Sequence, residues 1–283
     1  MKKLQDKYLK KEECELDTFS IRKVLQNSLS IQKIAYMAVF IAASVAVVLI
    51  FNTFVPLMII QSFRVAFAGI FVKIAGLILG PIIGGLSGLL TDLFILILRP
   101  ADYHPGYTLT LMLFGTVAGL TLFLRESIRK LKNRNILFYI TIILLVLVAI
   151  ASSFAFIEFA PDTLLLFNVS FLEFELAQVI ALIVGSIVVF LTITLFLKNW
   201  YKTKPEKLND LLVIIVMNVV IDFIISQPLI SFFDGYSAVS GVPYLTVYMT
   251  RLGTTTITVL WNTLLIYVIW RILQPIVFRR IYN

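Results

Sequence analysis

The sequence predicts an all-α protein, a polytopic transmembrane helical bundle of about eight spans. Of its 283 residues 60% are hydrophobic and only 14% are charged, and its mean hydropathy is +0.97. A water-soluble domain with this composition could not cover its surface with polar side chains. The apolar residues also fall in runs of about 20, the length that a helix needs to cross the hydrocarbon core of a bilayer.

The sequence predicts a polar N-terminal tail followed by eight helices. The first 32 residues alternate lysines with acidic residues, which is too polar for a signal peptide and predicts a cytoplasmic tail. We divide the rest into four helices within 33–124, a further pair within 125–207, and two helices with the C-terminus within 208–283. The apolar runs predict spans over 33–51, 63–79, 82–98, 108–124, 136–157, 172–197, 210–231 and 245–270.

The basic residues predict the orientation. There are 24 Lys and Arg against 16 Asp and Glu, a formal charge of +8. With both termini in the cytoplasm, all but Arg64, Lys73, Arg99 and Arg251 fall on the inner side, as the positive-inside rule requires. We therefore expect a multi-pass protein of the cell membrane. Its charge requires no nucleic-acid partner, because the basic residues form a cytoplasmic fringe.

Several kinds of chemistry are excluded. Cys14 is the single cysteine and His104 the single histidine, so no internal disulfide forms and a transition-metal site lacks ligands. The chain has no phosphate-binding loop for ATP hydrolysis. Gly85-Leu86-Ser87-Gly88 resembles the nucleophile pattern of rhomboid-type proteases, but helical rise puts Ser87 roughly 25 Å from His104. We expect no enzyme activity, no cofactor and no metal.

Ionisable residues within a bilayer are costly, so each should have a partner or a task. Helical rise places Asp92, Asn218 and Asp222 at or beyond the midplane, and Arg64 and Arg251 in the outer half. These groups could converge on one outward-open cavity. The two arginines then either bind an anionic carboxylate or form internal ion pairs with Asp222 or Asp92.

Lys73 lies within the second predicted span, on a helix adjacent to that of Asp92. The favoured interpretation is a structural ion pair between Lys73 and Asp92. A proton relay through the same residues is the alternative.

The outer loop before the fourth span, residues 99–108, is the most distinctive segment. Its prolines and glycine stiffen the turn, and Tyr103, His104, Tyr107 and Thr108 supply flat faces and hydrogen-bonding groups. Such a loop can cap a planar ligand. It can equally be a tight reversal whose tyrosines anchor helix ends at the membrane interface.

Small residues mark surfaces where helices approach closely. They occur as Ala38-x-x-x-Ala42-x-x-x-Ala46 in the first span, as Gly80-x-x-x-Gly84-x-x-x-Gly88 at the third, and as Gly115-x-x-x-Gly119 in the fourth. The pattern does not say whether the neighbouring helix belongs to this chain or to another.

Residues 62–124 resemble one known family as a unit. Ser62-Phe63-Arg64, Leu79-Gly80-Pro81-Ile82-Ile83-Gly84-Gly85, Thr91-Asp92-Leu93 and Tyr103-His104-Pro105-Gly106-Tyr107-Thr108-Leu109-Thr110 are similar, in order and spacing, to the folate-type substrate-binding (S) subunit of energy-coupling factor (ECF) vitamin transporters. The first span and the segment from Pro243 to Leu273 extend the resemblance more loosely.

The resemblance implies a subunit that captures a vitamin, most naturally folate, from outside the cell. It would deliver the vitamin by toppling within a complex of a transmembrane coupling subunit and two ATP-binding cassette ATPases. Ala38 and Ala42 would then face the coupling subunit, and Tyr103, His104, Tyr107 and Thr108 would help to close the ligand pocket. Arg64, Asn218 and Arg251 join this substrate-binding set because of their depth in the membrane.

Such subunits usually have six helices, so the pair within 125–207 is expected to be an insertion into a six-helix core. Two alternatives remain open. The chain could be an S subunit for another vitamin, or a self-sufficient secondary transporter coupled to protons through Lys73, Asp92 and Asp222.

Overall fold

The structure is a computed structural model. It describes residues 30–54, 61–98, 105–130, 138–148, 150–151, 188, 195, 205–236 and 244–281. The described part is helical throughout and contains no strand, as the sequence predicts. The predicted span 172–197 lies outside the described residues except for single positions.

The first half supplies four helices: α3 (Ile31–Phe54), α4 (Gln61–Leu79), α5 (Pro81–Leu98) and α6 (Pro105–Lys130). Gly80 separates α4 from α5 with a φ of 101°, a conformation that glycine adopts without steric cost. Pro81 and Pro105 then open their helices, where a residue without an amide hydrogen costs no bond. These bounds match the helices expected over 33–51, 63–79 and 82–98 to within three residues, and α6 extends the helix expected over 108–124 at both ends.

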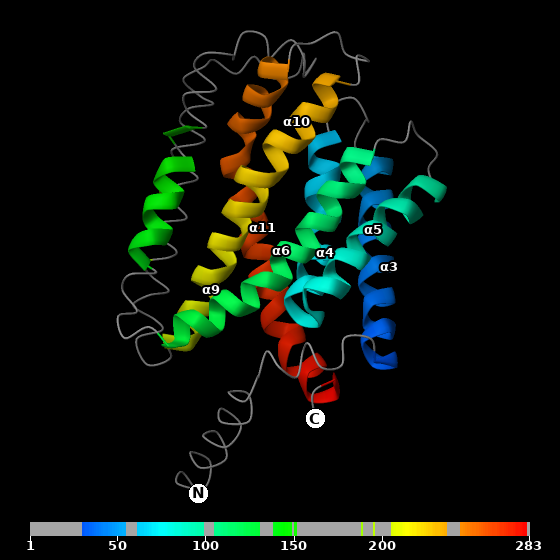
Figure 1. Cartoon of the computed structure of the whole chain (residues 1–283), viewed down its shortest axis with the longest axis vertical. Helices are drawn as coiled ribbons and strands as arrows, with labels where there is room; N and C mark the ends of the chain where they lie inside the picture. Colours follow the sequence, from blue (N-terminus) through cyan, green and yellow to red (C-terminus); the bar gives the residue numbers. More distant parts are fainter. Residues whose placement is uncertain are drawn as a thin grey trace, which may run out of the picture.

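The second half contributes the helix Phe138–Val148, then α9 (Pro205–Asn218), the π-helix η2 (Val219–Ser226), α10 (Gln227–Tyr236) and α11 (Tyr244–Ile281). The elements α9, η2 and α10 follow one another without a break as a single rod (Figure 1). The rod covers the predicted span 210–231, and α11 covers the span 245–270 and continues beyond it.

The π-helical stretch was not predicted, although its cause is present in the sequence. Pro228 is the second residue after η2, which ends at Ser226, and it has no amide hydrogen to donate to the carbonyl one turn earlier. A widened ladder before the proline accommodates the missing donor, and π-helical turns within α-helices are frequent at functional sites. The irregularity lies in the segment that carries Asp222.

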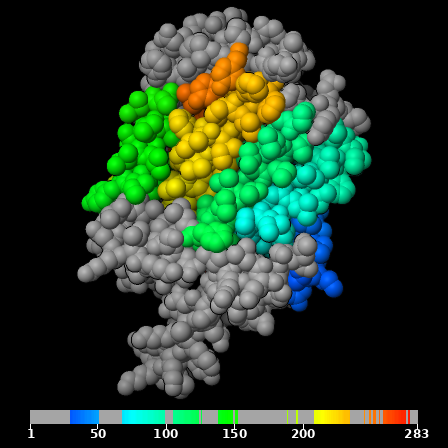
Figure 2. All heavy atoms as spheres, in the orientation of Figure 1, coloured from blue at the N-terminus to red at the C-terminus, as the bar shows by residue number. Residues whose placement is uncertain are grey.

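The helices form one bundle (Figure 1). α3 packs against α4 and α5 at one edge, α6 packs against both α4 and α5, and α11 contacts α4, α9 and α10. Figure 2 shows the atoms of α6 lying directly against those of the α9–η2–α10 rod, so the first and second halves form a continuous surface on this face. The start of α3 and the end of α11 lie at the same end of the bundle (Figure 1).

The glycine patterns mark contacts within this chain. α5 and α6 approach so closely that a Cβ atom on Gly115 would overlap the backbone carbonyl of Gly84, and one on Gly88 would overlap the carbonyl of Leu111. A Cβ atom on Gly76 of α4 would overlap the backbone carbonyl of Gly115 in the same way. The prediction of close helix packing is confirmed, and the neighbour is intramolecular for these glycines.

Four helices among the described residues are long and apolar enough to cross a membrane: Ile31–Ile50, Pro81–Leu98, Pro105–Phe123 and Leu208–Phe233. Shorter apolar helices lie at Ala68–Leu79, Phe138–Val148 and Thr258–Gln274. This supports a helical membrane protein. The predicted total of about eight spans stays a prediction.

Candidate functional site

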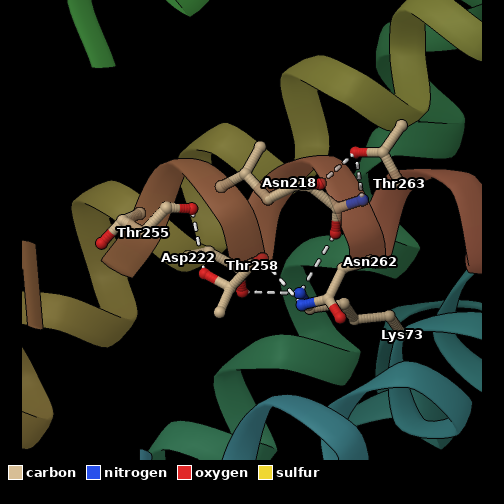
Figure 3. Close-up of polar contacts among 8 residues, drawn as sticks. Lys73, Asn218, Asp222, Thr255, Thr258, Asn262 and Thr263 are labelled. Atoms are coloured by element: carbon tan, nitrogen blue, oxygen red, sulfur yellow. Dashed lines mark hydrogen bonds and ion pairs between the residues drawn. The ribbon is translucent and has the colours of Figure 1, made fainter. Parts of the chain in front are cut away.

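A cluster of buried polar side chains lies where α4, the α9–η2 junction and α11 meet (Figure 3). We call it the central polar cluster and define it as Lys73, Asn218, Asp222, Asn262 and Thr263. All five are buried, and Lys73, Asn218 and Thr263 are fully so. Burial of ionisable groups in apolar helices is costly, which makes this cluster the leading candidate for a functional site.

The ammonium group of Lys73 is the centre of the cluster. Its Nζ lies 2.6 Å from Oδ1 of Asp222 and 3.1 Å from Oδ1 of Asn218, and 4.9 Å from the centre of the Phe114 ring. An ammonium has three N–H donors, so two oxygens and one aromatic face can satisfy it. The face of an aromatic ring attracts a cation through its quadrupole.

The side chains from α11 hold these acceptors in place. Nδ2 of Asn262 donates to Oδ2 of Asp222 over 3.2 Å, and Nδ2 of Asn218 donates to Oγ1 of Thr263 over 3.1 Å. Thr263 in turn donates to the carbonyl oxygen of Val259 over 2.7 Å. Because the amide nitrogen of Asn218 is engaged by Thr263, its oxygen is directed at Lys73 (Figure 3).

Local sequence explains this geometry. Asn218 and Asp222 are four residues apart, so they project from the same side of the rod. Gly69 precedes Lys73 by one turn of α4, and a Cβ atom there would come within 2.6 Å of the Phe114 ring. Glycine at this position therefore lets Phe114 of α6 lie over α4 and cover the ammonium.

The sequence predicts an ion pair between Lys73 and Asp92, and this prediction is wrong. Lys73 pairs with Asp222, whereas Asp92 accepts a hydrogen bond from Oγ1 of Thr108 over 2.5 Å. The interpretation considered neighbouring helices only, and the partner comes from 149 residues further along the chain. The Asp92–Thr108 contact instead ties α5 to the first turn of α6.

Arg251 lies on α11 and is buried, but it is not a member of the central polar cluster. It precedes Asn262 by 11 residues, or roughly 16 Å of helix. Arg251, Thr255, Thr258 and Asn262 recur at helical spacing on one face of α11. The hydroxyl of Thr255 donates to the carbonyl of Arg251, and that of Thr258 to the carbonyl of Thr255.

This spacing is the sequence signal that points to Asn262, whose side chain carries no charge. Thr263 was missed because a single hydroxyl in an apolar run carries no charge. Of the predicted convergence of Asp92, Asn218, Asp222, Arg64 and Arg251, the structure brings together Asn218 and Asp222.

The other predicted site residues are distributed as follows. The backbone of Arg64 belongs to α4, but its side chain lies outside the described part, as do Tyr103 and His104. Tyr107 is half-buried at the start of α6, and Thr108 is buried beside Asp92. Next to Asp92, the Thr91 hydroxyl is fully buried and has no hydrogen-bond partner among the described residues.

The predicted interface residues Ala38 and Ala42 are exposed on α3, and so is Ala46 one turn later. The opposite face of α3 is buried and includes Phe40, Ile41 and Ser44. The hydroxyl of Ser44 donates to the carbonyl of Ala68 in α4. The small-residue face of α3 is therefore directed away from its own bundle.

A second ion pair ties α6 to α9. Nε and Nη2 of Arg125 donate to Oδ1 and Oδ2 of Asp210 over 2.7 and 3.0 Å, and the guanidinium lies 5.9 Å from the centre of the Trp270 ring. The sequence assigned Arg125 only to the cytoplasmic fringe. The fork shows that it also joins the two halves of the chain.

Arg125→Lys should lower the free energy of unfolding by about 1–2 kcal/mol, since an ammonium cannot form the two parallel bonds of a guanidinium. Thermal unfolding in detergent would measure the loss. Arg271→Lys is the matched control, because the described residues show no carboxylate fork for this partly exposed arginine. Equal losses in the two variants would contradict the assignment.

Comparison with known proteins gives little coverage. No family model matches the chain, and no solved structure matches it. The chain is 38% identical over 74 residues to a protein of Mycoplasma pneumoniae described as "Uncharacterized protein MG098 homolog". The match covers 26% of this chain and 15% of that protein, so the chain matches only a small part of its relative's length.

Proposed function

We propose that the protein is the membrane-embedded substrate-capture subunit of an energy-coupling factor transporter. It binds a vitamin, most naturally folate, from outside the cell for uptake driven by partner subunits. It is multi-pass, has both termini in the cytoplasm, and has an insertion within 125–207 in a six-helix core. The chain has no ATPase motif of its own, so a coupling subunit and two ATP-binding cassette ATPases supply the energy.

The observation that carries this proposal is the outward-facing small-residue side of α3. Ala38 and Ala42 are the residues that the family resemblance assigns to the coupling subunit, and both are exposed while the other side of α3 packs on α4 and α5. Small side chains let another helix backbone approach closely in a membrane.

The substrate end rests on the outer ends of α5, α6 and α11. Tyr107 and Thr108 lie in the first turn of α6, the buried hydroxyl of Thr91 has no partner among the described residues, and Arg251 lies buried towards the start of α11. A flat pterin would stack on a tyrosine ring, and an arginine would bind the glutamate carboxylates of folate.

Purified protein should bind folate without ATP. Arg64→Ala should weaken binding by about tenfold or more, since a hydrogen bond to a charged group contributes about 1.5–3 kcal/mol. Tyr107→Ala should also weaken it, since a stacked aromatic pair contributes about 0.5–1.5 kcal/mol. Isothermal titration would measure this. Tyr139→Ala is the control, because Tyr139 is 60% exposed on the helix Phe138–Val148. Tight binding of another vitamin and none of folate would keep the class of protein and reject the ligand.

Ala42→Trp should abolish copurification with the coupling subunit while leaving vitamin binding intact, because the indole would hold the two helices apart. Coexpression with the coupling subunit and its ATPases, followed by affinity purification in mild detergent, would measure it. Leu120→Trp is the control, on an exposed position of α6. Unchanged copurification of Ala42→Trp would reject the assigned interface.

A second candidate is a self-sufficient proton-coupled transporter, and the buried Lys73–Asp222 pair favours it. Liposomes that contain this chain alone separate the two candidates. Uptake driven by a proton gradient and lost in Asp222→Asn would support the second. Uptake that requires the ATPases and ATP would support the first.

A further inference from the structure

The central polar cluster has the composition of a cation-binding site. The groups around the Lys73 ammonium are a carboxylate oxygen, an amide oxygen and the face of an aromatic ring, at 2.6, 3.1 and 4.9 Å. They come from η2, from the end of α9 and from α6. None belongs to α4, the helix that carries the lysine.

The oxygens of this site are oriented by contacts that do not involve Lys73. Asn262 donates to the second carboxylate oxygen of Asp222. Thr263 accepts from the amide nitrogen of Asn218 and is itself fixed to the carbonyl of Val259. Supporting hydrogen bonds of this kind hold ligand groups in place around a bound ion. The acceptor oxygens should therefore keep their positions when the lysine side chain is removed.

The charge balance also depends on one residue. Asp222 is buried, and the ion pair that the structure gives it is with Lys73. Arg125, the other described basic residue in such a pair, is engaged by Asp210. A buried carboxylate without a counter-charge is strongly unfavourable, so a positive charge in this position stabilises the ionised form of Asp222.

We propose that Asn218, Asp222 and the Phe114 ring form a preformed site for an ammonium-type monovalent cation, and that Lys73 occupies it as a ligand tethered to α4. This inference does not rest on the capture of a vitamin, since it concerns residues of the bundle interior.

Chemical rescue tests the proposal. Lys73→Ala removes three methylene carbons and the ammonium, which together correspond to n-propylammonium. Addition of n-propylammonium chloride should raise the melting temperature of the variant by several degrees, with saturation. Tetramethylammonium chloride controls for ionic strength, because it has the same charge but no N–H donor. The wild-type protein should show no such response, since its site is filled.

Lys73→Ala/Asp222→Asn is the matched control variant, because it keeps the cavity but removes the carboxylate. An equal rise in this variant, or with tetramethylammonium, would overturn the proposal. If the variant folds too poorly to purify, a fluorescent fusion reports folding instead. Membrane extracts are solubilised with each salt, and the monodisperse peak in size-exclusion chromatography is measured. Absence of the peak in n-propylammonium would also overturn it, since a preformed site must be refilled by the free cation.

Discussion

Lys73→Met is expected to lower the free energy of unfolding by about 3–5 kcal/mol, the usual cost of breaking a buried ion pair from one side. Methionine fills most of the space of the lysine side chain, so a cavity contributes little. The loss arises because the Asp222 carboxylate remains buried without its counter-charge. It also leaves Oδ1 of Asn218 without its donor.

The double variant Lys73→Met/Asp222→Leu distinguishes this cause from lost packing. It should be more stable than Lys73→Met alone, even though it carries one more substitution, because no charge is left buried. Unfolding in mixed micelles with increasing denaturing detergent would measure both. Additive losses would show that the two side chains do not interact energetically. Val213→Ala, at a buried apolar position of α9, gives the scale for lost packing alone.

Gly115→Ala is expected to lower the free energy of unfolding by about 3 kcal/mol and to broaden the size-exclusion peak. A single methyl group there would overlap the backbone of Gly84, and backbone cannot move aside as a side chain can. Overpacking of a tight contact costs about 1–3 kcal/mol, occasionally more. The separation of α5 from α6 would also disturb the contact of Gly115 with Gly76 on α4.

Gly85→Ala is the matched control, since it makes the same chemical change on α5. Its Cβ atom would meet Oγ1 of Thr116 at 2.5 Å, a side-chain atom that can rotate. Its effect should stay within about 1 kcal/mol, because alanine also favours the helix. Equal effects in the two variants would show that the α5–α6 contact is looser than the structure has it.

The sequence predicts the helices well and the polar contacts poorly, for a physical reason. Apolar runs and prolines act locally, so the bounds of α3 to α6 follow from neighbouring residues. The partner of Lys73 depends on which distant helix packs against α4, and no local pattern encodes that. Adjacency along the chain suggested Asp92, whereas tertiary packing selected Asp222.

The residues predicted to bind substrate show the same division. Helical rise places Asn218 and Arg251 at predicted depths in the membrane, and both side chains are buried in the structure. It could not place them relative to one another, and Arg251 lies three turns along α11 from the central polar cluster. The π-helix follows from a single proline whose effect on the ladder depends on what packs around it.

The separation of Lys73 from Asp222 also has a consequence during synthesis. The lysine leaves the ribosome 149 residues before its counter-charge, which at roughly 5–20 residues per second is a delay of about 7–30 s. Throughout that interval α4 has to stay in place without the ion pair that later neutralises the charge of Lys73. Its glycine contacts with α5 and α6 are made by chain that emerges soon afterwards. The packed helices α4, α5 and α6 can therefore bury Lys73 before the segment that carries Asp222 is synthesised.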